Sequence, residues 1–188
     1  PFETPREHAL GDGRLVAWVR RLRLVPLLQG LTLAAFALAI VTGYFGNQDP
    51  QRNFSMHFFW IAFALGVTYL SALLGNGYTV LGPWQVLAAL IGRVFKGFTR
   101  GRFAYPAWLA YWPALLLYMV FIGQELMGDG QPRSLAIGLL IYTGITMVAV
   151  WCFGARAWFR HGEFFTVLFR LVAMMAPVAY RPEETGGR

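Results

Sequence analysis

The sequence predicts an all-α, polytopic transmembrane protein made of two tandem helical hairpins. Four apolar stretches carry this prediction, because a helix rises about 1.5 Å per residue and about 20 residues cross the roughly 30 Å hydrocarbon core of a bilayer. None of them contains Lys, Arg or Asp, and one contains a single Glu near its end, whereas a soluble helix of this length would carry a charged face. The stretches are Val25–Phe45, Phe54–Leu74, Ala107–Met127 and Leu135–Phe153.

The composition supports the same fold class. Of the 188 residues, 57% are hydrophobic and only 13% are charged, and the mean hydropathy is +0.49. Such a chain is too apolar for a solvated surface, so we expect one integral membrane domain over residues 1–188, surrounded by the lipid bilayer. Cys152 is the only cysteine, which leaves no intrachain disulfide and no thiolate metal cluster.

The distribution of basic residues predicts the orientation of the chain. With the four spans in place, eleven Arg and Lys residues flank one side and two flank the other, which is the positive-inside pattern. The N-terminus and the loop 75–106 are therefore expected in the cytoplasm. The same distribution accounts for the net charge of +7, so no nucleic-acid partner is expected. The eleven are Arg6, Arg14, Arg20, Arg21, Arg23, Arg93, Lys96, Arg100, Arg102, Arg156 and Arg160, and the two are Arg52 and Arg133.

The first part of the chain is expected to enter the membrane once and return. Residues 1–24 form a cytoplasmic arm that ends in an interfacial amphipathic helix over Arg14–Arg23, with apolar side chains on one face and arginines on the other. Residues 25–74 form the first hairpin, closed by the outward turn Gly46–Asn53. Because the chain begins without Met and shows no charged segment before a short apolar core, we expect no signal peptide and a processed or partial chain.

The second part repeats this plan. Residues 75–106 are expected to form a basic cytoplasmic loop with an interfacial helix, and residues 107–153 a second hairpin, in which Pro113 kinks the third span. Residues 154–188 are expected to form an interfacial or re-entrant segment and a tail.

The two segments that follow the hairpins, Thr79–Phe98 and Phe164–Tyr180, are apolar but too short or too charged for a simple span. We expect both to lie along the cytoplasmic face or to dip into the membrane; for the second, the alternative is a fifth span, with Arg170 reaching the headgroups. They share a weak motif, Gly-x-Trp-x-Val-Leu-x-x-Leu from Gly82 and Gly-x-x-Phe-x-Val-Leu-x-x-Leu from Gly162. The motif indicates either a repeat of parallel hairpins or the shared composition of two interfacial helices.

The spans themselves offer little chemistry. No charged residue lies near the middle of a span, where proton relays and ion-coupled carriers place one. His57 and His161 fall at opposite ends of their spans, so they cannot share a haem. No nucleotide-binding or hydrolase motif is present, and any cofactor stays unassigned.

The candidate catalytic residues are Glu125 and His57, which lie at similar depth at the outer rim of spans three and two. A carboxylate and an imidazole at the same depth could together act as a general acid and base. The alternative is that both are ordinary polar helix ends, with Glu125 paired with Arg133 or Arg52.

The order of motifs between residues 40 and 178 resembles the family of bacterial integral membrane proteins known as fenitrothion hydrolases. The similarity implies a hetero-oligomeric component of the bacterial inner membrane linked to the hydrolysis of organophosphate triesters, and it carries over no catalytic residue. Members of the family are longer, with further spans at both ends. The matching segments are Gly46–Asn53, Ser71–Gly75, Pro83-Trp84, Tyr105-Pro106, Tyr111–Pro113, Glu125, Gly162–Phe169 and Ala176-Pro177.

The residues themselves favour a subunit of a larger multi-subunit membrane complex, with mainly a structural or assembly role. The reasons are the absence of charges within the spans, the short loops and the small residues on the helix faces. The alternative is a component of a membrane-bound hydrolase acting on apolar organophosphate triesters, so whether the chain is an enzyme stays open.

The topology can be tested by cysteine accessibility labelling at Asp49 and Thr99. A cysteine at position 49 should react with a membrane-impermeant reagent added outside the cell, and one at position 99 should react only after the membrane is opened, because the basic loop is cytoplasmic. Labelling of position 99 alone from outside would overturn the orientation.

Overall fold

The computed structural model describes residues 24–176, and every regular element in this range is a helix. Four of these helical segments are long and apolar enough to cross a membrane, which confirms the polytopic helical fold. The predicted helix Arg14–Arg23 and the tail after residue 176 lie outside the described residues. The four spans are α2 (Leu24–Phe45), a composite second span (Phe54–Leu74), a third (Ala107–Met127) and α8 (Pro132–Phe153).

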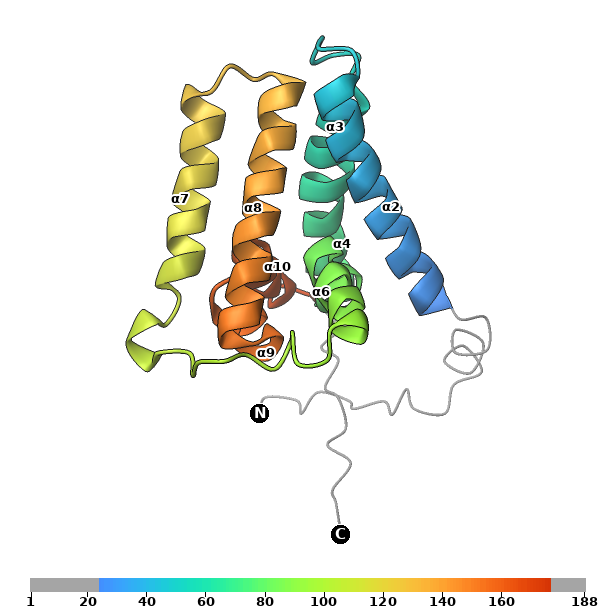
Figure 1. Ribbon diagram of the computed structural model, residues 1–188. Helices are drawn as coiled ribbons and strands as arrows, with labels where there is room; N and C mark the ends of the chain where they lie inside the picture. The colour runs from blue at the N-terminus through green and yellow to red at the C-terminus, as the bar shows by residue number, and fades with distance from the viewer. Residues whose placement is uncertain (1–23, 177–188) are drawn as a thin grey trace, which may run out of the picture.

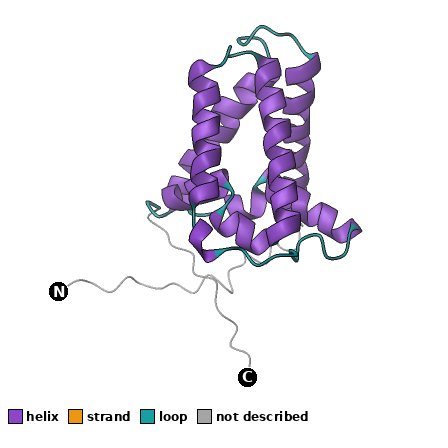
Figure 2. Cartoon of the chain, turned by 60° about the vertical axis from the view of Figure 1, so that its left-hand side comes forward, coloured by secondary structure: helices purple, strands orange, loops and turns teal. Residues whose placement is uncertain are grey.

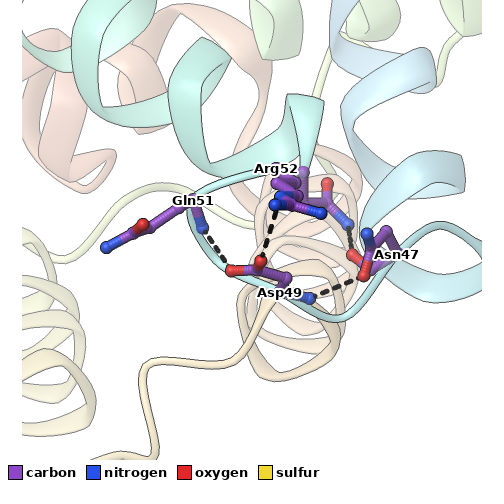
Figure 3. A network of polar contacts seen from close by, with 5 residues as sticks. Asn47, Asp49, Gln51 and Arg52 are labelled. Carbon is purple, nitrogen blue, oxygen red and sulfur yellow. Dashed lines mark hydrogen bonds and ion pairs between the residues drawn. The ribbon is translucent and has the colours of Figure 1, made fainter.

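The four spans run side by side, and two tight turns lie at one end of the bundle (Figure 1). We call this the turn end, and the opposite end, which holds the loop 95–111, the basic end. In the first turn, Gly46–Asn53, the side chain of Asp49 accepts a hydrogen bond from the backbone of Gln51 and pairs with Arg52 at 3.6 Å (Figure 3). The side chain of Asn53 then caps the second span by accepting from the backbone of Ser55.

The second span is not a uniform α-helix, which its sequence pattern did not indicate. It consists of α3 (Phe54–His57), a π-helical segment (Phe58–Gly66) and α4 (Val67–Leu74). The π-helix is rare and places side chains at a different angular spacing from that of an α-helix. Here it turns Phe59 and Phe63 into the protein interior, where both are buried.

Each hairpin is followed by two short helices that run back into the bundle. The second span and α8 both end at a glycine, Gly75 and Gly154, with φ of +85°, a conformation that side chains disfavour. In both cases the chain then reverses direction and forms a first short helix, a break at Gly82 or Gly162, and a second short helix. These are α5 (Tyr78–Leu81) and α6 (Pro83–Val94) after the first hairpin, and α9 (Ala155–His161) and α10 (Phe164–Ala173) after the second.

The N-termini of α6 and α10 lie at the depth of the middle of α8. The indole nitrogen of Trp84, in the first turn of α6, donates to Thr143 at 2.9 Å, and the hydroxyl of Tyr142 donates to Glu163, which precedes α10. Tyr142 is the eleventh of the 22 residues of α8. Both helices therefore dip into the bundle from the basic end, as Figure 2 also shows for the short helices, and they do not lie flat on its face.

Within the described residues, the segment that begins at Phe164 does not form the fifth span considered as an alternative above. Helix α10 has ten residues, which cover roughly 15 Å, about half of a bilayer core. It starts at mid-depth and ends at Ala173, where a turn follows. Its ten residues therefore cover only the half of the bundle toward the basic end. We call α6 and α10 the half-membrane helices.

The two half-membrane helices pack reciprocally. Helix α6 contacts α2 of its own hairpin and α8 of the other, while α10 contacts α7 of its own hairpin and α4 of the other. At their meeting point the rings of Trp84 and Phe165 stack with centroids 5.1 Å apart and planes inclined by 6°. The next residues, Gln85 and Thr166, share a hydrogen bond of 2.6 Å. These pairs occupy matching places in the weak motif, which favours the repeat over shared composition.

One pair of spans departs from this reciprocity. Helix α2 lies tightly along α8, where Ala39 and Ala136 are fully buried and a Cβ added to Gly43 would come within 2.9 Å of Ala136. Helix α7 (Trp112–Met127), which holds the corresponding place in the second hairpin, buries only Ala114. It stands apart from its neighbours in Figure 1.

The third span also differs from its prediction. Pro113 is the second residue of α7 and lies in its first turn, where a proline nitrogen needs no partner, so it does not kink the helix. The residues before it form a 3₁₀ turn (Ala107–Leu109), and Ala110 has a φ of +37°. The regular helix is therefore shorter than the apolar stretch that predicted it.

The tight contact of α2 with α8 can be tested by Gly43→Ala. We expect a loss of about 1–3 kcal/mol in the free energy of unfolding, because the new methyl group overlaps the backbone carbonyl of Pro132 at 2.9 Å. Gly30→Ala on the same helix, where nothing lies within 4 Å, should leave stability equal or slightly higher. Unfolding in detergent micelles measures both, and equal stabilities would contradict the contact.

Candidate functional site

The most unusual polar group of the described chain is the carboxyl group of Glu163. It lies in the turn between α9 and α10 and its side chain is fully buried. Glu163 is the N-cap of α10, and a negative charge is favoured at the N-terminus of a helix. Its oxygens accept from the backbone nitrogens of Phe165 at 3.1 Å and Thr166 at 2.6 Å.

Two hydroxyl groups complete the surroundings of this carboxyl group. Tyr142 donates to it from the middle of α8, and the Thr166 hydroxyl donates to it from the first turn of α10. The amide of Gln85 on α6 in turn donates to the Thr166 hydroxyl. The network around Glu163 therefore links α8 and both half-membrane helices.

The electrostatics of this centre follow from burial. Glu163 lies outside the four spans, and loss of solvent raises the pKa of its carboxyl group, while the hydrogen bonds from Thr166 and Tyr142 oppose that rise. Burial also raises the pKa of the Tyr78 hydroxyl, and the charge of Glu163 adds to this effect. The Tyr78 hydroxyl has no hydrogen-bond partner within the described residues.

This arrangement suits a structural connection better than a catalytic base. An ionised carboxylate offers about four lone-pair directions, and four donors occupy them here. A catalytic base would need a free direction toward its substrate. The aromatic rings of Trp84, Phe63 and Phe165 pack around the centre and exclude water from it. We therefore identify Glu163 as the residue that fixes the meeting point of the two hairpins.

A cavity of about 180 Å³ lies on the other side of this centre, between α7, α8 and the second span. Its inner end is formed by Tyr142 and Phe165, and its walls are apolar. Polar residues line it toward the turn end, among them Gln124 and Ser134. There, hydrogen bonds from Ser134 and the backbone of Gln131 lower the pKa of Asp129. We call this cavity the lateral pocket.

Only one of the two predicted rim residues lines this pocket. Glu125 lines it, whereas His57 does not, and the His57 ring nitrogen Nδ1 lies 3.0 Å from the backbone oxygen of Asn53. Among residues 24–176 no hydrogen bond or ion pair joins Glu125 to His57. Their joint action as acid and base stays a prediction.

The alternative pairing of Glu125 with an arginine is also absent from the described part of the chain. Arg52 pairs with Asp49, and Arg133 lies over the ring of Tyr44 with its guanidinium carbon 4.8 Å from the ring centroid. Within the same residues, no three side chains of His, Cys, Asp and Glu lie together as the ligands of a metal ion would.

Sequence reasoning missed the role of Glu163, because this residue lies outside every apolar stretch. The local signal was present in Gly162-Glu163-Phe164-Phe165-Thr166, which places an acid at an N-cap. Nothing in that signal indicates that the cap enters the bundle as far as Tyr142.

Comparisons with known proteins identify no relative. No family model matches the chain, and neither a curated protein nor a solved structure is similar to it. The function is therefore argued from the geometry alone.

The structural role of Glu163 predicts the effect of Glu163→Gln. We expect a loss of about 3 kcal/mol or more in unfolding free energy, because the amide places N–H donors against donors that cannot turn away. Glu125→Gln, an exposed change of the same chemistry, should stay within about 0.5 kcal/mol of the wild type. Denaturation in micelles compares them, and equal stability of the two variants would remove Glu163 from this role.

Proposed function

We propose that this chain is an integral membrane subunit of a larger membrane assembly, and that a transmembrane helix of a partner subunit packs along α7 and α8. The observation that supports this proposal is the isolation of α7. Four-helix membrane proteins are held together by close side-chain packing, since lipid tails provide no hydrophobic force between helices. A span that buries one residue lacks that packing.

The first hairpin indicates which kind of contact is missing at α7. Helix α2, which holds the matching place, is packed against α8 through Gly43, Ala39 and Ala136. Small residues at that contact let two backbones approach closely. The second hairpin offers similar positions beside the lateral pocket, where Gly123 on α7 and Gly144 on α8 have nothing within 4 Å.

The polar residues of α7 also support a contact with a partner helix along this surface. Gln124 and Glu125 are exposed near its turn end, and Gln124 donates to the backbone oxygen of Ser134 at 3.2 Å. Exposed polar groups on a span are costly toward lipid and are commonly covered by another helix. A partner helix that places one large apolar side chain in the lateral pocket would cover them.

The lateral pocket also favours a second candidate function, a component of a hydrolase for apolar organophosphate triesters. Its volume of about 180 Å³ and apolar walls suit one aromatic ring, since engineered apolar cavities of about 150 Å³ bind benzene. Glu125 is the carboxylate on its lining. The resemblance to fenitrothion hydrolases agrees with this candidate, whereas the position of His57 outside the lining does not support it.

Purification in mild detergent with mass measurement separates the two functions. We expect the chain to co-purify with other membrane polypeptides in a fixed ratio, since α7 requires a neighbour. A monodisperse monomer that hydrolyses a chromogenic dialkyl aryl phosphotriester would overturn the subunit proposal and support the hydrolase.

The position of the partner can be tested by Gly144→Leu. A Cβ added at this position has no atom of this chain within 4 Å, so the protein should fold normally but lose its partner polypeptides during purification. Gly30→Leu makes the same change at an exposed position of α2, also with nothing within 4 Å, and should keep them. Retention of partners by both variants, or loss by Gly30→Leu alone, would exclude the surface beside the lateral pocket.

A further inference from the structure

A second cavity, of about 500 Å³, opens near the basic end between the short helices. It is bounded by α5 and α6 on one side and by α9 and α10 on the other, with Thr99 of the connecting loop at its edge. We call it the basic vestibule. Its inner end is formed by Gln85 and Thr166, the polar pair next to Glu163.

Three arginines line the vestibule. Arg156 and Arg160 come from α9, where a spacing of four residues places them on one face of the helix. Arg170 comes from α10, and its guanidinium group lies near Tyr111, 3.4 Å from the hydroxyl oxygen. The cavity thus faces guanidinium groups from two helices that the fold holds together.

No acidic side chain of the described residues balances these charges. Seven of the nine Arg and Lys residues in the range 24–176 lie toward the basic end. Of the four acidic residues in the same range, three belong to the turn end, and the fourth, Glu163, is buried with four donors. The one ion pair of this range, Asp49 with Arg52, is also at the turn end.

Two polar residues of the lining have side-chain oxygens that are closed off. The side-chain oxygens of Asn76 and Gln85 are buried and have no hydrogen-bond partner within the described chain. The Gln85 oxygen lies toward Gly82, where an added Cβ would collide with it, and Gly82 does not line the vestibule. What the cavity offers a ligand is therefore its arginines.

We propose that the basic vestibule binds the phosphate group of a phosphate ester, with the phosphate on Arg156 and Arg160. Guanidinium groups bind phosphate through paired, charge-assisted hydrogen bonds, which a single ammonium group cannot reproduce. This chemistry is shared by the headgroup of an anionic phospholipid such as phosphatidylglycerol and by soluble glycerol phosphate. Basic pockets between helices bind such headgroups at the cytoplasmic side of membrane proteins.

Thermal unfolding of the full chain provides the test. The protein is reconstituted in nanodiscs of phosphatidylcholine, with or without phosphatidylglycerol, and separately titrated in phosphatidylcholine discs with glycerol 3-phosphate and inorganic phosphate at constant ionic strength set by chloride. We expect a higher unfolding midpoint with one of the phosphate compounds than in phosphatidylcholine discs with chloride alone, because a ligand that binds only the folded protein stabilises it. A shift with the lipid assigns the headgroup as the ligand, and a shift with glycerol 3-phosphate assigns the soluble ester.

Paired variants make the result specific. Arg156→Gln with Arg160→Gln should weaken binding on the order of tenfold or more. Lys96→Gln with Arg100→Gln removes the same charge from the basic end outside the vestibule and should leave binding unchanged. If the first pair unfolds without ligand, Arg156→Lys with Arg160→Lys keeps the charge, loses the paired geometry and should still weaken binding.

Two results would overturn the proposal. One is a midpoint that follows chloride as closely as the phosphate esters, and the other is an equal loss in both Gln pairs, since either would show general screening.

Discussion

The hydrogen bonds of the Glu163 carboxyl group are the interaction on which the rest of this structure depends. A carboxyl group removed from water is strongly destabilising unless donors surround it. Four donors meet it here, and they come from α8 and from the first turn of α10. The requirement for these donors fixes the depth of α10, because Tyr142 is in the middle of its span. The same requirement sets Thr166 against Gln85 and so positions α6.

The half-membrane helices follow from this constraint together with two glycines. Gly75 and Gly154 let the chain reverse at the basic end, and the helices that follow meet by the stacking of Trp84 and Phe165. Aromatic packing of this kind contributes contact area without adding unsatisfied polar groups. A polar centre enclosed by rings is therefore a stable solution in the interior of a membrane protein, where each unsatisfied group is expensive.

The same centre separates two cavities of different character. The lateral pocket is apolar, ends at Tyr142 and Phe165, and opens beside the loosely packed α7. The basic vestibule is cationic and ends at Gln85 and Thr166. The reciprocal packing of the short helices explains this division, because it closes the bundle at mid-depth and leaves one cavity toward each end.

Much of the architecture could be predicted from the sequence, because a span is defined by local properties. Length and apolarity identified all four spans, and the residues of Gly46–Asn53 identified the turn between the first two. The motif shared by the segments from Gly82 and Gly162 left two interpretations open, and the contact of Trp84 with Phe165 favours the repeat. The same criteria also marked 107–111 as the start of the third span, although its helix begins at Trp112, since hydropathy does not register the backbone turn at Ala110.

The sequence by itself determined that four segments between residues 24 and 153 are long and apolar enough to cross a membrane, and where the basic residues gather, since these depend on the composition of continuous segments. Only the tertiary structure decided the π-helical turn at Phe58–Gly66, the burial of Glu163 and the presence of Glu125, but not of His57, in the lining of the lateral pocket. Each of these depends on which residues from distant segments meet in space. A carboxyl group in a polar turn and one at the centre of a bundle have the same local sequence, and only packing around them distinguishes the two.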